Sequence, residues 1–115
     1  MEDSKKTRII QEYVPGKQVT LCHLISKPDK NLYDKLGLMD ISGSIGILTI
    51  TPGEGAIVGG DIALKTANVH IGYLDRFNGS LVIYGDVSAV ESSLKSVVAT
   101  LKDKLGFHPC AFTKS

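Results

Sequence analysis

Three histidines and two cysteines are the residues in this sequence best suited to chemistry. His23, His70 and His108 lie far apart in the chain, and none has a carboxylate at the spacing of a metal site. Cys22 and Cys110 also lack metal-ligand spacing, and we expect them to be small buried thiols rather than a disulfide. His23 and His70 fall in predicted strands, where we expect them to serve as structural side chains.

Phosphate-binding and nucleophile motifs are missing from the sequence. No G-x-G-x-x-G follows a predicted strand and opens a helix, no Walker lysine pattern occurs, and no nucleophile elbow is present. Tyr73, Phe77 and Tyr84 are too scattered to stack RNA bases, so we expect them to pack in the core. These patterns predict that the protein is not an enzyme and binds no cofactor, unless a site is assembled between subunits.

Length and charge predict a single, nearly neutral domain. The chain has 115 residues, and its 13 Lys and Arg against 12 Asp and Glu leave a net charge of +1. Such a surface has no basic field for nucleic acid and opposes self-association only weakly. The sequence shows neither the apolar run of a signal peptide nor a stretch long enough to span a membrane, which favours the cytoplasm.

Hydrophobic periodicity predicts a ferredoxin-like α+β domain. Strands are predicted over residues 8–14, 18–25, 44–50, 69–75 and 81–85. Helices are predicted over 28–36, from residue 52 onward, and over 87–105. We expect a four-stranded antiparallel or mixed sheet with helices on one face, and the first strand apart from it. Residues 107–115 receive no assignment.

Local signals mark where these elements begin and end. Two capping boxes are predicted to start helices, one formed by Thr51 with Glu54 and the other by Ser88 with Glu91. Gly37 and Gly106 are predicted to end helices, and Asn78-Gly79 predicts a hairpin between the last two strands.

Three segments resemble bacterial microcompartment shell proteins. Residues 61–69 (Asp-Ile-Ala-Leu-Lys-Thr-Ala-Asn-Val) are similar to the family's helix-to-strand signature, and residues 85–90 (Gly-Asp-Val-Ser-Ala-Val) to its entry into the second large helix. Residues 23–28 (His-Leu-Ile-Ser-Lys-Pro) resemble a segment that usually follows that helix but here precedes the first core strand. This order implies a circular permutation whose native ends lie close together.

A permuted subfamily carries the closest likeness. Residues 8–21, 71–77 and 113–115 are very similar to permuted shell proteins of ethanolamine and propanediol utilisation, and choline utilisation is a further candidate. The resemblance implies a homohexamer that tiles with other shell proteins into the shell of a cytoplasmic microcompartment. Encapsulated enzymes are further candidate partners, and the resemblance implies neither nucleic acid nor membrane as a partner.

The resemblance also implies roles for two lysines at the hexamer edge. Lys65 occupies the position of an edge lysine, although it could equally be a solvated helix residue paired with Asp61. Lys27 occupies a second edge position that is normally arginine, and lysine lacks arginine's planar set of donors.

The resemblance divides the chain into an extension, residues 1–16, and a circularly permuted BMC domain, residues 17–115. In the permuted subfamily the extension supplies a strand to a sixfold β-barrel that caps the pore, here formed by Arg8, Ile9, Ile10, Gln11, Glu12, Tyr13 and Val14. An edge strand on the main sheet is the alternative for this segment. The hairpin expected in the pore region contains Asp75, Arg76, Phe77, Asn78 and Gly79.

A different class of function also fits the predicted fold. A small oligomeric regulator with ferredoxin-like topology could bind a metabolite between its subunits. We carry this regulator as the alternative to a shell subunit.

Overall fold

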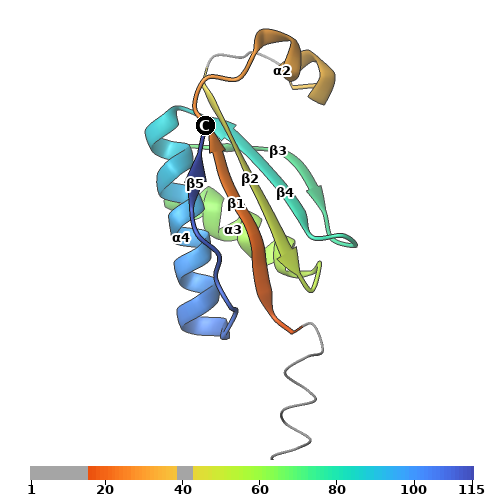
Figure 1. Cartoon of the computed structure of the whole chain (residues 1–115), viewed down its shortest axis with the longest axis vertical. Helices are drawn as coiled ribbons and strands as arrows, with labels where there is room; N and C mark the ends of the chain where they lie inside the picture. Colours follow the sequence, from red (N-terminus) through yellow and green to blue (C-terminus); the bar gives the residue numbers. More distant parts are fainter. Residues whose placement is uncertain (1–15, 39–42) are drawn as a thin grey trace, which may run out of the picture.

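Five strands and three helices make up the part of the chain that the computed structural model describes, residues 16–38 and 43–115. The strands are β1 (Gln18–Ile25), β2 (Ser44–Thr51), β3 (His70–Asp75), β4 (Ser80–Gly85) and β5 (Thr113–Lys114). The helices are α2 (Lys30–Leu36), α3 (Gly55–Thr66) and α4 (Val87–Leu105) (Figure 1). The strand predicted at residues 8–14 lies outside the described residues.

The centre of the sheet is β2. The strand order is β3-β4-β2-β1-β5, with β1 and β4 both antiparallel to β2, and β3 antiparallel to β4. The sequence of β2, Ser-Ile-Gly-Ile-Leu-Thr-Ile-Thr, is apolar on both faces, as expected of a strand with packing on each side. The predicted α+β class, with antiparallel pairing of the central strands, is therefore confirmed.

A fifth strand corrects the predicted four-stranded sheet. Residues 107–115 run back along β1, where Val19 N–H donates to the His108 carbonyl and Ser115 N–H donates to the Leu24 carbonyl, each at 2.8 Å. The result is β5, parallel to β1 at the sheet edge. A two-residue strand has too little periodicity to be recognised from sequence.

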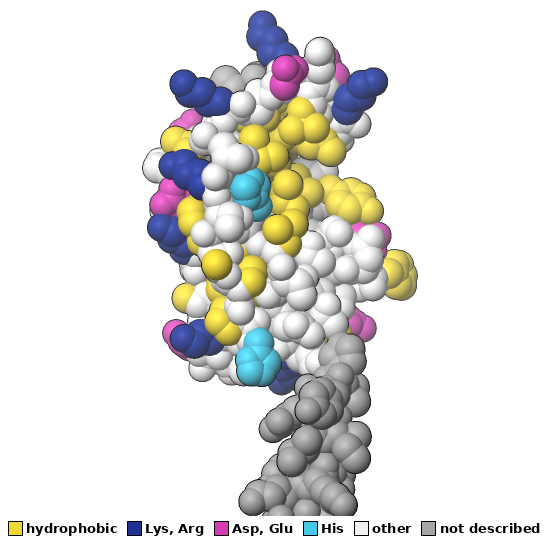
Figure 2. Space-filling model, viewed as in Figure 1, with side chains coloured by type: hydrophobic (Ala, Val, Ile, Leu, Met, Phe, Trp, Pro, Cys, Tyr) yellow, Lys and Arg dark blue, Asp and Glu magenta, His cyan; other side chains and the backbone are white. Residues whose placement is uncertain are grey.

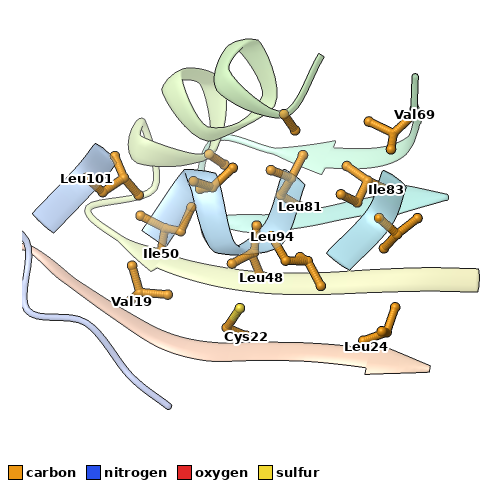
Figure 3. Close-up of a cluster of buried hydrophobic side chains, with 14 of the residues drawn as sticks. Val19, Cys22, Leu24, Leu48, Ile50, Val69, Leu81, Ile83, Leu94 and Leu101 are labelled. Carbon is orange, nitrogen blue, oxygen red and sulfur yellow. The ribbon is translucent and has the colours of Figure 1, made fainter. Parts of the chain in front are cut away.

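The main core lies between the sheet and the two long helices. Leu24, Leu48, Ile50, Leu81 and Ile83 point from the strands toward α3 and α4 and are fully buried (Figure 3). From α4 the predicted apolar stripe supplies buried residues, namely Val90, Leu94, Val97 and Leu101. The helices α3 and α4 therefore cover one face of the sheet, as predicted.

The short helix α2 does not lie on the same face as α3 and α4, contrary to the prediction that the helices share one face. Its Tyr33 packs with Leu38 and Ile45 in a second cluster, which also takes in Val82 and Tyr84 from the sheet face opposite α3 and α4. In Figure 1 the helix stands beyond one end of the sheet. Most of that second face therefore has no helix over it in the described part of the chain.

Both predicted capping boxes are wrong. Thr51 pairs with Gln18 as the last residue of β2, and a turn then delays the start of α3 to Gly55. Asp86 is the residue before α4, so Ser88 already lies inside the helix. The predicted glycine stops are confirmed, because Gly37 and Gly106 follow α2 and α4 with left-handed backbone.

The predicted hairpin between β3 and β4 is confirmed, and its turn packs tightly on the end of β2. Gly79 has a φ of 78° and accepts a 2.9 Å hydrogen bond from Ile50 N–H. A Cβ at Gly79 would collide with the Ile50 carbonyl oxygen, and one at Gly53 would collide with the Arg76 carbonyl oxygen. The backbone of the turn therefore packs directly against the backbone of β2 and of the residues that follow it.

We expect Gly79→Ala to destabilise the fold far more than Gly106→Ala. Both glycines have left-handed backbone, but a Cβ at Gly106 meets nothing within 4 Å. Gly106→Ala should lower the free energy of unfolding by about 1–2 kcal/mol, the cost of left-handed backbone for an L-residue. Gly79→Ala should add the collision with Ile50, so urea unfolding that gave equal losses for the two variants would contradict this account of the turn.

Candidate functional site

His23 and His70 both contact side chains of neighbouring segments. His23 lies between two hydroxyls of the C-terminal segment, with Nδ1 2.6 Å from Thr113 Oγ1 and Nε2 2.8 Å from Ser115 Oγ. His70 is exposed and packs its ring against Tyr84, with 5.2 Å between centroids. Within residues 16–38 and 43–115 no group of three or more His, Cys, Asp or Glu side chains could hold a metal ion. The structural role predicted for His23 is confirmed.

The two cysteines are free thiols that line one cavity. Burial raises the pKa of Cys22 to about 11, and the charge of nearby Cys110 adds to this rise. Burial also raises the pKa of Cys110. Both thiols are thus protonated at neutral pH, which makes them poor nucleophiles. The prediction of a buried thiol is confirmed for Cys22, whereas Cys110 is only partly buried.

Lys65 lies in the outer face of α3. Its Nζ is 2.9 Å from Asp61 Oδ2, and its side chain remains 76% exposed. An exposed pair of this kind contributes little to stability, so the lysine is free to exchange Asp61 for a partner outside the chain.

Lys27 borders a polar depression at the start of α4. Ser26, Ser44 and Asp86 are among the other residues that line its volume of about 480 Å³. Ser44 is fully buried and donates a 2.9 Å hydrogen bond to the Ser26 carbonyl, which fixes the end of β1 from which Lys27 projects.

The hairpin residues expected in the pore region come together in one turn. Asp75 Oδ1 accepts hydrogen bonds from the amides of Phe77 at 2.8 Å and Asn78 at 3.2 Å. These amides hold the pKa of the Asp75 carboxyl below its usual value. Tyr73 Oη donates to Asp75 Oδ2 at 3.1 Å. Sequence reasoning missed this arrangement, although an aspartate two residues before the turn centre is a recognised turn signal.

The prediction that Phe77 packs in the core is wrong. Its side chain is 84% exposed, and Arg76 lies over its ring at 4.9 Å from the centroid. Tyr73 is also half exposed, and only Tyr84 joins a buried cluster. Tyr73, Phe77 and Ile57 of α3 border an open apolar groove of about 500 Å³.

Apolar side chains also gather on the open face of the sheet near α2 (Figure 2). In the described part of the chain, no helix is long and apolar enough to cross a membrane. Contiguous exposed apolar patches are typical of surfaces that contact other proteins. The groove and this patch are therefore candidate surfaces for contact with other proteins.

Known proteins have sequences similar to this chain over most of its length. Residues 44–110 match the family model for the BMC domain. The chain is 58% identical over 110 residues to the bacterial microcompartment shell protein EutS of Escherichia coli, which covers 96% of this chain and 98% of that protein. It is 57% identical over 108 residues to the shell protein PduU of Salmonella typhimurium, with coverage of 94% and 93%.

Solved structures are similar to this chain in both fold and sequence. A CutR flat hexamer has a TM-score of 0.85 to this chain at 47% identity, covering 94% of this chain and 99% of that chain. CutR has also been solved as a screw, with a TM-score of 0.84 at 44% identity and coverage of 88% and 100%. None of these relatives is named as a metabolite-binding regulator, so the comparisons do not support that alternative. The chain belongs to the BMC-domain family of bacterial microcompartment shell proteins.

Proposed function

We propose that this protein is a structural subunit of a microcompartment shell, that it forms hexamers and that these tile with other shell proteins. The observation that carries the proposal is the 47% identity, over almost the whole chain, to a protein solved as a flat hexamer. The near-neutral charge and the exposed apolar groups on the hairpin are consistent with self-association. Neither an enzymatic reaction nor a cofactor is part of the proposal.

Sedimentation and negative-stain imaging test this function directly. The purified chain should have a mass six times the 12.3 kDa of one copy and should form six-membered rings or sheets. A stable monomer or trimer that never forms six-membered rings would rule out the proposed function.

The circular permutation belongs to the same proposal. The BMC match begins at residue 44, yet β1, which precedes it, lies inside the sheet between β2 and β5. In the usual order β1 would follow α4, so the end of α4 should lie beside the start of β1. His108 N–H donates to the Lys17 carbonyl at 2.8 Å, and Lys17 Nζ donates to the Leu105 carbonyl at 3.1 Å. These contacts support a permuted order.

The hexamer edge is proposed to contain Lys65 and Lys27. Lys65 projects from an exposed helix face, and its weak pair with Asp61 leaves it available to a neighbouring hexamer. Lys27 is exposed beside the polar depression, where its single ammonium would make a less directional contact than the usual arginine.

We expect Lys65→Ala to weaken sheet formation while hexamers persist. Lys104→Ala is the control, because it removes an exposed lysine from the last turn of the other long helix. Imaging of two-dimensional sheets and sedimentation of the soluble hexamer would separate the two levels of assembly. Loss of the hexamer in Lys65→Ala, or equal loss of sheets in the control, would show that Lys65 is not an edge residue.

The pore is proposed to be capped by the extension, residues 1–16, with its strand at residues 8–14 in a sixfold barrel. The hairpin of Asp75, Arg76, Phe77, Asn78 and Gly79 is proposed to lie in the pore region. A capped pore would restrict the passage of metabolites, which favours a capping or docking role over bulk transport. The resemblance to permuted shell proteins supports this proposal, and it leaves the choice among ethanolamine, propanediol and choline pathways open.

Deleting residues 1–16 should leave the hexamer intact and open its axis. The extension is proposed to contribute to the barrel alone, whereas every described strand and helix begins after it. Electron microscopy of the full-length and truncated rings would compare density on the sixfold axis. Unchanged central density in the truncated ring would exclude the barrel.

A further inference from the structure

The helix α4 carries a second stripe of residues beside the one that packs in the core. The members of this stripe recur at spacings of three and four, and they are Lys95, Val98, Ala99 and Lys102. Residues at these spacings share one face of a helix. A lysine stands at each end of the stripe and two small apolar side chains lie between them, so this face of α4 presents an apolar patch between two positive charges.

The second stripe forms one wall of a cavity of about 250 Å³. The opposite wall comes from β1 and from the segment that leads to β5, and its residues are Cys22, Pro109, Cys110 and Phe112 (Figure 1). Burial raises the pKa of both thiols, so both are uncharged at neutral pH. The interior of the cavity is therefore apolar, and charge is confined to the lysines at its rim.

The two lysines at the rim differ in their surroundings. Lys95 Nζ lies 2.8 Å from Glu91 Oε2 and 4.9 Å from the centroid of the Phe112 ring, so its charge is already partly compensated. Lys102 is exposed, and among the described residues no carboxylate lies within ion-pair distance of its ammonium. An apolar cavity next to an ammonium of this kind is suited to a ligand with an apolar tail and one negative charge.

We propose that this cavity binds a medium-chain carboxylic acid, with the tail against Val98 and Phe112 and the carboxylate on Lys102. An apolar cavity of roughly 150 Å³ can hold benzene. The larger volume here therefore has room for a chain of about six to eight carbons. Burial of the tail would supply most of the affinity, and the exposed ion pair would mainly fix the orientation. This site is separate from the proposed assembly and does not depend on the number of subunits.

Calorimetry with the purified full-length protein tests the class of ligand. Octanoate should bind saturably with one molecule per chain, whereas acetate has the charge without the tail and should not bind. 1-Octanol has the tail without the charge and should bind more weakly than octanoate. Hexanoate should also bind more weakly, by about fourfold for each of its two missing methylenes. Failure of octanoate to bind, or equal binding of acetate or 1-octanol, would overturn the proposal.

Two pairs of variants test the position of the site. Ala99 lines the cavity from an exposed position on α4, so Ala99→Phe should fill the cavity and abolish octanoate binding, whereas Ala99→Ser should retain it. Lys102→Gln should weaken octanoate binding several-fold and leave 1-octanol binding unchanged. Lys104→Gln is the matched control, because Lys104 shares the last turn of α4 but does not line the cavity. Octanoate binding that survives Ala99→Phe, or equal losses in the two lysine variants, would overturn this site.

Modification of Cys110 gives a further measurement that needs no substitution. A tail in the cavity would cover the Cys110 thiol, so saturating octanoate should slow the reaction of Cys110 with N-ethylmaleimide, as followed by mass spectrometry. An unchanged rate would overturn the site even if Ala99→Phe does not fold. Assembly is a separate outcome, because a chain that binds octanoate but never forms hexamers would overturn the proposed function and leave this site standing.

Discussion

Close packing at small residues is the constraint on which the rest of this structure depends. A Cβ at Gly46 of β2 would come within 2.8 Å of Val90 and 3.0 Å of Leu94, so α4 can approach the central strand only because glycine is there. At Gly59 and Gly60 of α3 a Cβ would meet core side chains at 3.2 Å, a close contact but a less restrictive one. Because protein interiors tolerate little change in volume, this face of the sheet is committed to holding the two helices.

Because α3 and α4 cover this face of the sheet, contacts of the sheet with other molecules must involve its edges or the second face. At one edge the hairpin turn is fixed by Asp75 and Gly79, and at the other β5 is fixed to β1 through His23. Both edges therefore present defined surfaces rather than loose segments.

The chemistry of the side chains agrees with a structural role. His23 has both ring nitrogens within hydrogen-bond distance of hydroxyls, and burial raises the pKa of the two thiols. The strongest features of the described surface are instead exposed apolar groups, which suit contacts between proteins. For a shell subunit, function is a property of these surfaces and of their arrangement in the assembly.

The sequence by itself determined the elements with strong local signals: the apolar stripe of α4, the hairpin at Asn78-Gly79, the two glycine helix stops and the missing catalytic motifs. It also carried the resemblance to shell proteins. Only the tertiary structure decided β5, the late start of α3, the exposure of Phe77 and the shared cavity of the cysteines. These depend on contacts between distant residues, such as the 90 positions that separate His23 from Thr113, and no local pattern encodes such contacts.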